Sequence, residues 1–364
     1  MPSSLPVTVL AGAERGLLER VARGLLSNSD TPIAAVVPAT GGPKTSPRGS
    51  WIPTRPKLER WGAGCSCCTV RSDVVVKTRG LLEEGSASHV LLVLPPGDEL
   101  DPLVKAFTVS DPEGRRLGDE ATVRRLLVVA SLTDVLGGPA GRELCERIEL
   151  ADEVVLLTGE AGPDAIAAGS SVVAALNPSA TLTCAAAHSD IALDWAGVEG
   201  TFDLEASRQR AESALASDTA VEGVSRRAFE AVTPFHPQRL SDLLQSLPAG
   251  VYRMRGLFWV ASRPGYAGMV DAAGSEVTTR AGGVWWAAMP ESRMPNTPAF
   301  RQFRETWHPV LGDRVQQLVL IGEPEAIQAL ETALEECLVT QEEVDASDTW
   351  HRLPHPFPWP ADQP

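Results

Sequence analysis

The first half of the chain alternates short apolar runs with segments whose apolar residues repeat at helical spacing. The run at residues 6–11 is rich in β-branched side chains and stops at Gly12, after which Leu and Val recur every three or four positions through Leu26. Residues 40–56, rich in Gly, Ser and Pro, are predicted to form a loop. Continuous apolar strands that alternate with amphipathic helices indicate a mostly parallel sheet with helices on both faces. The same pattern predicts further strands at residues 32–37, 89–94, 126–130, 154–157 and 181–184, and a helix at residues 74–84.

The second half has the pattern of a smaller α+β domain. Residues 186–227 are rich in Ala, Ser and acidic side chains and are predicted to form a helical or partly flexible connection. Beyond it we expect strands at residues 251–262, 283–289 and 317–321 and a helix at residues 324–337. A proline at every second position from Pro354 removes backbone donors and excludes helix or central strand there. We therefore expect an α/β protein with domains at residues 1–185 and 228–350, a connection at 186–227 and a Pro-rich tail at 351–364.

Charge and composition narrow the classes of partner. The chain of 364 residues has 32 basic and 47 acidic side chains and a formal net charge of -15. Nucleic acid and anionic membranes would be repelled, so we expect neither as a direct partner. There is no apolar run of about 20 residues and no signal-like start, which favours a cytoplasmic protein.

The turn after the first predicted strand stands where a phosphate-binding P-loop would stand. Such a loop needs glycines, a Lys for the β- and γ-phosphates and a Ser or Thr hydroxyl for magnesium. In the text that begins at Gly12, the Lys position holds Leu18 and the magnesium position holds Glu19. Leu18 supplies no charge, and Glu19 places a carboxylate where phosphate oxygens would lie. We expect an ordinary strand-to-helix turn, with residual nucleotide binding as the alternative.

Three of the six cysteines, Cys65, Cys67 and Cys68, lie within four residues of one another. They follow flexible glycines and precede a predicted helix, where thiolates are stabilised and their pKa is lowered. Three soft ligands suit zinc, or copper in its +1 state. No second Cys pair closes the site, so the fourth ligand is open, with His89, His188 or an incoming group as candidates.

Other interpretations of the three thiols remain open. They can form a redox-responsive switch, or they can pack as small residues in a loop. Because Cys67 and Cys68 are adjacent, a two-thiol site with a third accessory thiol is a further possibility. The remaining Cys145, Cys184 and Cys337 are predicted to pack as small hydrophobic residues.

Aromatic and histidine residues of the second domain are predicted to be mainly structural. Trp259, Trp285 and Trp286 fall in predicted strands, and at least two of them are expected in the core. Because Trp285 and Trp286 are adjacent, they are predicted to face opposite sides of a sheet, which leaves one for a partner. We find no Ser-His-Asp pattern and no paired carboxylates, and therefore expect no catalytic residues. Four histidines are predicted to be turn or loop residues: His236, His308, His351 and His355.

Several of these segments together resemble the CobW-like family of P-loop GTPases and metallochaperones. The stretch from Gly64 to Arg71 is similar to the family's Gly-Cys-x-Cys-Cys signature. The second half also resembles the C-terminal domain of the family, most continuously from residue 229 to residue 359. The segments that carry this resemblance are Pro234-Phe-His-Pro-Gln-Arg-Leu240, Gly256-Leu-Phe-Trp-Val-Ala-Ser-Arg-Pro264, Gly283-Val-Trp-Trp-Ala-Ala288, Trp307-His-Pro309 with Gly312-Asp-Arg314, and Gln317-Leu-Val-Leu-Ile-Gly322.

The chain departs from the family at the three places that GTP needs. The phosphate loop is lost. Leu94-Pro-Pro-Gly97 stands where the family's Walker B strand would end in an acidic residue and Thr-Ser-Gly. Leu157-Thr-Gly-Glu160 replaces the guanine-reading Asn-Lys-x-Asp. The resemblance therefore implies a pseudo-GTPase in which GTP and magnesium are not expected and enzyme activity is not expected.

The degenerate branch that this chain resembles implies a role in zinc homeostasis. Its actinobacterial members are zinc-starvation proteins that recruit a ribosome-hibernation factor to the small ribosomal subunit. The resemblance thus implies a zinc-linked adaptor or chaperone, with zinc on the three thiols and a protein partner that is a client metalloprotein or such a factor. The alternatives are an active GTP-dependent metallochaperone and a redox-responsive thiol switch.

Overall fold

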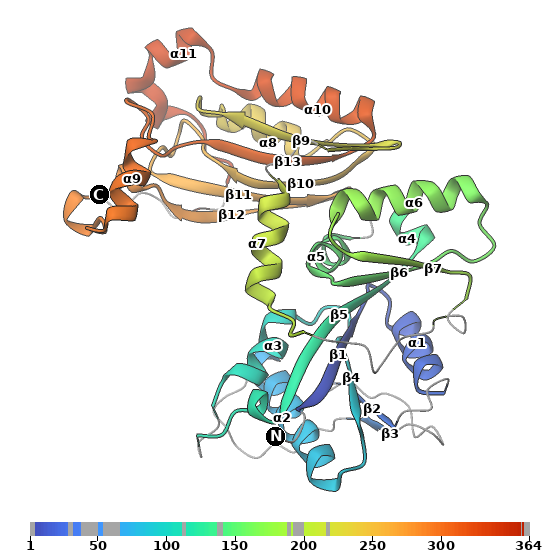
Figure 1. Ribbon diagram of the computed structural model, residues 1–364. Helices are drawn as coiled ribbons and strands as arrows, with labels where there is room; N and C mark the ends of the chain where they lie inside the picture. The colour runs from blue at the N-terminus through green and yellow to red at the C-terminus, as the bar shows by residue number, and fades with distance from the viewer. Residues whose placement is uncertain are drawn as a thin grey trace. The chain divides into compact units, whose positions relative to one another are not determined.

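The computed structural model describes residues 4–27, 32–37, 50–53, 66–110, 114–136, 141–187, 191, 200–215, 219–357 and 359. The chain divides into two compact units, Met1–Glu212 and Ser213–Pro364, drawn in Figure 1. Residue 228, where we expect the second domain to begin, lies within strand β9 (Val224–Ala231). Among the helices described, none is both long enough and apolar enough to cross a membrane.

The first unit is built on a seven-stranded sheet with the order β3-β2-β4-β1-β5-β6-β7. All of its described strand pairs are parallel, which confirms the predicted parallel sheet. The central strands are buried because both faces are covered. Their bounds are β1 (Leu5–Ala11), β2 (Ile33–Val37), β3 (Ser50–Pro53), β4 (His89–Val93), β5 (Ala121–Ser131), β6 (Glu153–Leu157) and β7 (Thr181–Ala185).

Helices lie on both faces of this sheet. Helix α1 (Arg15–Ser27) packs Leu18, Val21 and Leu25 against alternate residues of the central strands, as its helical spacing predicts. The intervening strand residues, such as Val9 and Leu92, are also fully buried and therefore face the other side, where Figure 1 shows α2 and α3. The other helices of the unit are α2 (Ser66–Glu84), α3 (Leu100–Thr108), α4 (Leu132–Leu136), α5 (Arg142–Leu150) and α6 (Pro163–Leu176), with a short 3-10 turn at Leu117–Asp119. Helix α7 (Leu204–Leu215) contains the boundary between the two units, after Glu212.

Two expectations for the first unit were wrong in their limits. Helix α2 begins at Ser66 rather than at residue 74, so Cys67 and Cys68 lie inside its first turn and not before it. The predicted loop at residues 40–56 contains the edge strand β3. A four-residue strand at an edge gives no periodic signal long enough to separate it from its Gly- and Pro-rich surroundings.

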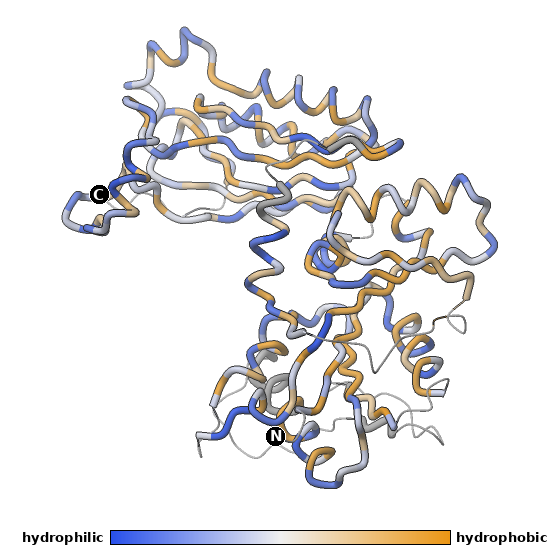
Figure 2. Tube along the Cα trace, viewed as in Figure 1, coloured by the Kyte–Doolittle hydropathy of each residue, from blue (hydrophilic) through white to orange (hydrophobic). Residues whose placement is uncertain are grey.

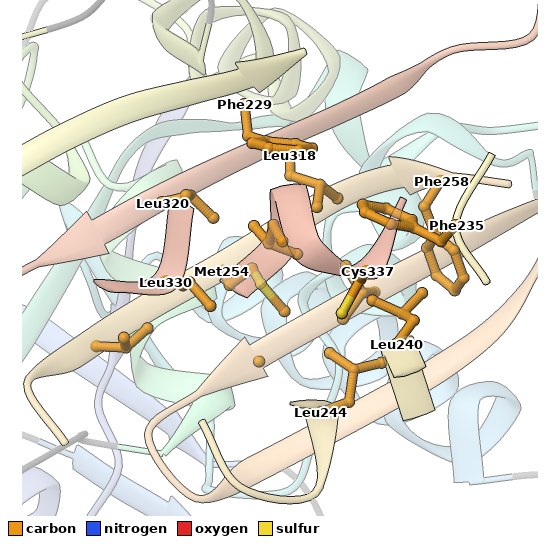
Figure 3. Packing of buried hydrophobic residues seen from close by; sticks show 14 of the residues in the cluster. Phe229, Phe235, Leu240, Leu244, Met254, Phe258, Leu318, Leu320, Leu330 and Cys337 are labelled. Carbon is orange, nitrogen blue, oxygen red and sulfur yellow. The ribbon is translucent and has the colours of Figure 1, made fainter. Parts of the chain in front are cut away.

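The second unit is a six-stranded antiparallel sheet with the order β12-β11-β10-β13-β9-β8. Helices α8 (Pro237–Leu244) and α10 (Pro324–Cys337) cover the main core of this unit, whose residues include Phe235, Met254 and Leu330 (Figure 3). Figure 2 shows that the outer face of α10 is hydrophilic and that the face toward the sheet is apolar. The remaining elements are β8 (Thr219–Val221), β10 (Val251–Phe258), β11 (Tyr266–Ala273), β12 (Glu276–Val284), α9 (Pro298–Glu305), β13 (Gln316–Gly322), α11 (Gln341–Asp345) and 3-10 turns at Trp286–Ala288, Glu291–Arg293 and Ser347–Arg352.

The sequence located β13 and α10 well but misplaced the ends of the strands that precede β13. Strand β10 ends at Phe258 rather than at residue 262, and the strand expected at residues 283–289 is the end of β12, which stops at Val284. The β11–β12 hairpin was missed. Its second strand is mostly exposed and carries no apolar run, and its turn rests on Gly274 with a φ of 54°.

The proline-rich tail contributes directly to the core of the second unit. The Phe357 and Trp359 rings stack on each other with centroids 5.2 Å apart, and both pack against Phe258. Alternation with proline makes this possible, because an extended chain sends every second side chain to the same face. The segment beyond Arg352 is neither helix nor strand where it is described, as the prolines predict.

Gly268 on β11 makes room for the tail. A Cβ at this position would lie 2.6 Å from Trp359 Cη2 and 2.7 Å from Phe258 Cζ. We therefore expect Gly268→Ala to lower the free energy of unfolding by about 1–3 kcal/mol, the usual effect of overpacking. Urea denaturation followed by tryptophan fluorescence measures it. Gly80→Ala on α2, where nothing lies within 4 Å, is the matched control and is expected to be neutral or stabilising; equal effects would contradict the packing role.

Candidate functional site at the carboxyl edge of the parallel sheet

Strands β1, β4 and β5 are neighbours in the sheet and end at the same edge. In open α/β sheets, ligands bind at this carboxyl edge, because the loops and helix N-termini that follow the strands converge there. The first turn (Gly12), the loop after β4 (Leu94–Asp98) and the start of α2 all follow strands at this edge. It is therefore the place to test the sequence predictions.

The turn between β1 and α1 is packed as part of the core. Leu18, at the position of the missing Lys, is 1% exposed and lies among the apolar residues beneath α1. Glu19 is half-buried at the surface, where its carboxylate lies 3.9 Å from Arg23, one helical turn away. A Cβ on Gly12 would lie 2.5 Å from the Val129 carbonyl oxygen, so this glycine serves the close approach of β1 and β5. Neither Leu18 nor Glu19 offers a cation to a phosphate.

A buried arginine connects the loops of this edge. Arg147 on α5 is only 4% exposed, and its Nη1 donates to the Gly12 carbonyl at 2.6 Å. Its Nη2 donates to the carbonyls of Pro95 and Asp98, each at 3.0 Å. The guanidinium thus joins the first turn to the loop after β4. Because a buried guanidinium needs acceptors for its N–H groups, these backbone carbonyls are part of its solvation.

Glu143 completes this contact from one turn earlier on α5. Its carboxylate forms an ion pair with Arg147 and accepts the Gly97 backbone N–H at 2.8 Å. Burial lowers the pKa of Arg147, and the neighbouring Glu143 and Asp98 oppose that effect. Burial raises the pKa of Asp98, against the influence of Arg147 and Arg15. The cation therefore points into backbone carbonyls, and one loop N–H that could face an anion is occupied by Glu143.

The turn after β6, at the position of the guanine-reading motif, is also tied to the sheet. The Thr158 backbone N–H and hydroxyl both donate to the Ala185 carbonyl, at 2.9 and 3.3 Å. Gly159 follows with a φ of 58°, a conformation that suits glycine. The side chains of this turn provide no Asn and no Lys or Asp for a base.

The three thiols meet the described structure only in part. Cys65 lies outside the described residues, while Cys67 and Cys68 are in the first turn of α2, and their side chains are not described. Because α2 leads from β3 to β4, its N-terminus is at the carboxyl edge of the sheet, on the same side as Gly12. The exposed N–H groups of a helix N-terminus favour thiolates.

The topology removes His89 from the candidates for a fourth ligand. A helix of 19 residues is about 28 Å long, and His89 starts β4 just beyond the other end of α2. His89 is 1% exposed, and its Nε2 lies 2.9 Å from Thr8 Oγ1, to which Arg125 Nε also donates at 3.3 Å. The other candidate, His188, lies outside the described residues.

The other cysteines are unlike one another. Cys145 and Cys337 are buried, as expected, and burial raises the pKa of the Cys337 thiol to about 11. Cys184 is exposed, so the expectation that it packs as a small hydrophobic residue was wrong. Within the described part of the chain, no group of three His, Cys, Asp or Glu side chains could hold a metal ion.

The Pro-Phe-His-Pro-Gln-Arg-Leu segment of the second unit has a structural role. His236 is the N-cap of α8, where its Nδ1 accepts the Arg239 N–H at 3.4 Å. Arg239 donates to both oxygens of Glu343 at 3.0 and 2.7 Å and to the Leu338 carbonyl at 2.8 Å. This motif therefore joins α8 to the α10–α11 connection rather than forming a reactive site.

Sequence reasoning missed Arg147 and Glu143. Their spacing of four residues on a helix predicts an ordinary surface ion pair, and only the position of α5 makes them a clamp. It also missed Asp313, whose carboxylate accepts the backbone N–H groups of Trp286 and Ala287 at 2.9 Å each. A Gly-Asp-Arg triplet gives no signal for such a long-range cap.

The burial of His89 generates a pH dependence. Burial, and secondarily Arg125, lower its pKa from 6.5 to about 4, so the folded protein prefers the neutral ring. The stability that this contributes is present above pH 6.5 and is lost as the pH falls toward 4, with a total of about 3 kcal/mol. We expect His89→Gln, which retains a partner for Thr8, to flatten this part of the stability profile. Urea titrations from pH 7 to 4 test this; parallel losses in both proteins would refute it.

Comparisons with known proteins identify one domain and several similar proteins. Residues 224–338 match the family model described as "Cobalamin synthesis protein cobW C-terminal domain". A zinc-regulated GTPase metalloprotein activator 1 of Dictyostelium discoideum is 24% identical over 323 residues, which cover 79% of this chain and 68% of that protein. A zinc chaperone of Mycobacterium tuberculosis is 29% identical over 345 residues, 86% of this chain and 82% of that protein.

Among solved structures, the zinc-bound YjiA GTPase of E. coli aligns over 93% of this chain and 100% of its own, with 12% identity and a TM-score of 0.39. The sequence relatives cover most of the chain, and the domain match lies in its second half. The chain carries a CobW C-terminal domain at residues 224–338.

Proposed function

We propose that this chain is a zinc-linked accessory protein, an adaptor or chaperone in zinc homeostasis that works without a GTP cycle. Its relatives include one named a zinc-regulated GTPase metalloprotein activator and one named a zinc chaperone, which supports the link to zinc. The proposal that the protein works without GTP rests on one observation: at the carboxyl edge of the parallel sheet, Arg147 joins the Gly12 turn to the loop after β4.

At the described residues of this edge, the side chains and backbone groups that would bind a triphosphate are replaced or already occupied. Leu18 is in the core, so no cation stands at the Lys position, and Glu19 adds a carboxylate. A phosphate-binding loop presents backbone N–H groups, whereas here the Gly12 carbonyl points to Arg147 and the Gly97 N–H is held by Glu143. A triphosphate at this edge would compete with the buried Arg147–Gly12 hydrogen bond and the exposed Gly97–Glu143 hydrogen bond.

The zinc site of the proposal consists of Cys65, Cys67 and Cys68. Zinc prefers thiolate ligands, and the exposed N–H groups of a helix N-terminus favour thiolates in general. With Cys65, Cys67 and Cys68 as three ligands and no fourth ligand among the described residues, one coordination position is open to a group from a client. Such an open position suits transfer or sensing better than permanent structure.

The partner in this proposal is a protein, and the chain acts in the cytoplasm. A client metalloprotein fits the name of the Dictyostelium relative, and a ribosome-hibernation factor on the small subunit fits the resemblance drawn from the sequence. In either case residues 228–350 supply the docking domain, connected through residues 186–227 to the degenerate GTPase-like domain at residues 1–185.

The metal claim is tested by the zinc content of the purified protein. We expect about one zinc per chain, and nearly none after Cys65, Cys67 and Cys68 are all changed to Ser, because the soft ligands are gone. Cys184→Ser is the matched control, since this thiol is exposed and belongs to β7. Equal zinc content in the wild type and the triple variant would contradict the proposed zinc site. A thiol cluster that binds no zinc and oxidises reversibly under mild peroxide would favour the redox switch.

Nucleotide binding separates this proposal from an active GTPase. We expect calorimetry with a non-hydrolysable GTP analogue and magnesium to detect no binding below about millimolar concentration, because the buried Leu18 supplies no charge at the Lys position. Binding of ADP and GDP is measured in the same way as a control for nucleotide specificity. Tight, magnesium-dependent binding would show that Leu18 and Glu19 do not prevent nucleotide binding, and it would favour the GTP-dependent metallochaperone.

A further inference from the structure

The segment between β12 and β13 carries a helix that covers no core. Helix α9 has no buried residue, although Phe300 and Phe303 lie within it. Phe303 is 42% exposed, and Val310, just beyond the helix, is 82% exposed. Figure 1 shows α9 beyond the end of the sheet, away from the face that α8 and α10 cover. Exposed large apolar side chains that gather in one place are typical of interaction surfaces.

Four aromatic side chains of this segment form a continuous row, which we call the aromatic row: Trp286, Phe300, Phe303 and Trp307. The Phe300 ring centroid lies 5.0 Å from that of Trp286 and 6.2 Å from that of Trp307, and Phe303 lies 5.9 Å from Trp307. These three contacts are edge-to-face, a stable geometry for aromatic pairs. Arg304 lies over Trp307, 5.4 Å from the ring centroid.

The aromatic row is fixed by contacts beneath it. Asp313 accepts the Trp286 and Ala287 N–H groups, and Arg314 donates to the Pro264 and Leu311 carbonyls at 2.6 and 2.7 Å. The N-cap Thr297 accepts the Phe300 N–H at 3.2 Å. A surface that is ordered before binding loses less conformational entropy when a partner arrives. The row is thus a prepared face and not a loosely attached loop.

Charge separates this face from the rest of the protein. Residues 284–311 contain three Arg (Arg293, Arg301, Arg304) and two Glu (Glu291, Glu305), a net of +1. Since the whole chain has a net charge of -15, the remainder has -16. Arg301 donates to the neutral Asn296 side chain at 2.7 Å, and the Arg304–Glu291 pair, at 3.5 Å, is exposed and therefore weak. An acidic partner is repelled least here.

The composition of the segment also fits a protein interface. Residues 284–311 include three Trp, two Phe, two Met and three Arg but neither Lys nor Asp. Aromatic residues, Met and Arg are enriched in interface cores, where Lys, Glu and Asp are depleted. Two copies of this chain, each with a net charge of -15, repel one another, which favours a different protein as the occupant.

We propose that the aromatic row, with Arg293, Arg301 and Arg304, is the surface on which a partner protein docks through an acidic segment with apolar anchors. The inference rests on the proposed function, because it names the surface that an adaptor needs. The anchors pack on Phe303 and Trp307, and the carboxylates pair with Arg301 and Arg304, whose planar guanidinium groups suit carboxylate oxygens.

The test uses the full chain and two fluorescein-labelled peptides of equal length, one of alternating Glu and Leu pairs and one with Lys in place of Glu. In fluorescence polarisation at low salt we expect the acidic peptide to bind at least about tenfold more tightly, against the net charge of the protein, and to weaken as salt is added. Phe303→Ser and the double variant Arg301→Glu/Arg304→Glu are each expected to weaken it at least about tenfold.

Two control variants and the zinc content make the outcome specific. Arg23→Glu on α1 repeats a charge reversal elsewhere, and Val232→Ser removes another exposed apolar side chain of the second unit; neither should change the affinity. Absence of acidic-peptide binding, equal or tighter binding of the basic peptide, or unchanged affinity in the row variants would overturn the inference. A dimer in sedimentation experiments that Phe303→Ser dissolves would assign the face to a second copy and also overturn it. Normal zinc content in the same samples would show that only the docking surface has failed, and not the proposed function.

Discussion

The buried guanidinium of Arg147 is the contact on which the carboxyl edge of the first unit depends. Its hydrogen bonds to Gly12, Pro95 and Asp98 connect loops that are far apart in sequence and that a bound nucleotide would connect in a P-loop protein. Burying this cation is costly unless its donors are satisfied, so the carbonyls and Glu143 stabilise one closed arrangement. The edge loops are therefore held together by a cation that belongs to the chain itself.

The second unit uses the same principle for another purpose. Asp313, Arg314 and Arg239 are polar side chains that hold backbone groups of distant segments, and each belongs to a stretch by which the sequence resembles the CobW family. These contacts fix the aromatic row and the α8–α11 connection around an apolar core that includes the tail residues Phe357 and Trp359. Motifs that resemble functional signatures therefore have a structural explanation here.

Together the two units suggest a division of labour. In the proposed function, Cys67 and Cys68 at the start of α2 would bind zinc together with Cys65, and the aromatic row on the second unit would bind a protein partner. No step in this scheme needs the energy of a nucleotide. A partner that supplies both an acidic segment and the missing zinc ligand would couple docking to metal exchange through mass action alone.

The sequence by itself determined the parallel sheet, β13, α10 and the absence of a charge at Leu18, because these follow from hydrophobic periodicity and residue identity. It indicated the thiol cluster but not its place at the start of α2, since helix ends depend on local backbone contacts more than on periodicity. It did not determine the Arg147 clamp, the buried state of His89 or the scaffold under the aromatic row. Their long-range contacts join residues that are far apart in the sequence, 26 positions for Asp313 with Ala287 and 135 for Arg147 with Gly12. Only the tertiary structure decides which polar group meets which backbone carbonyl or N–H, because the same Arg, His or Asp on a free helix or loop would be solvated by water.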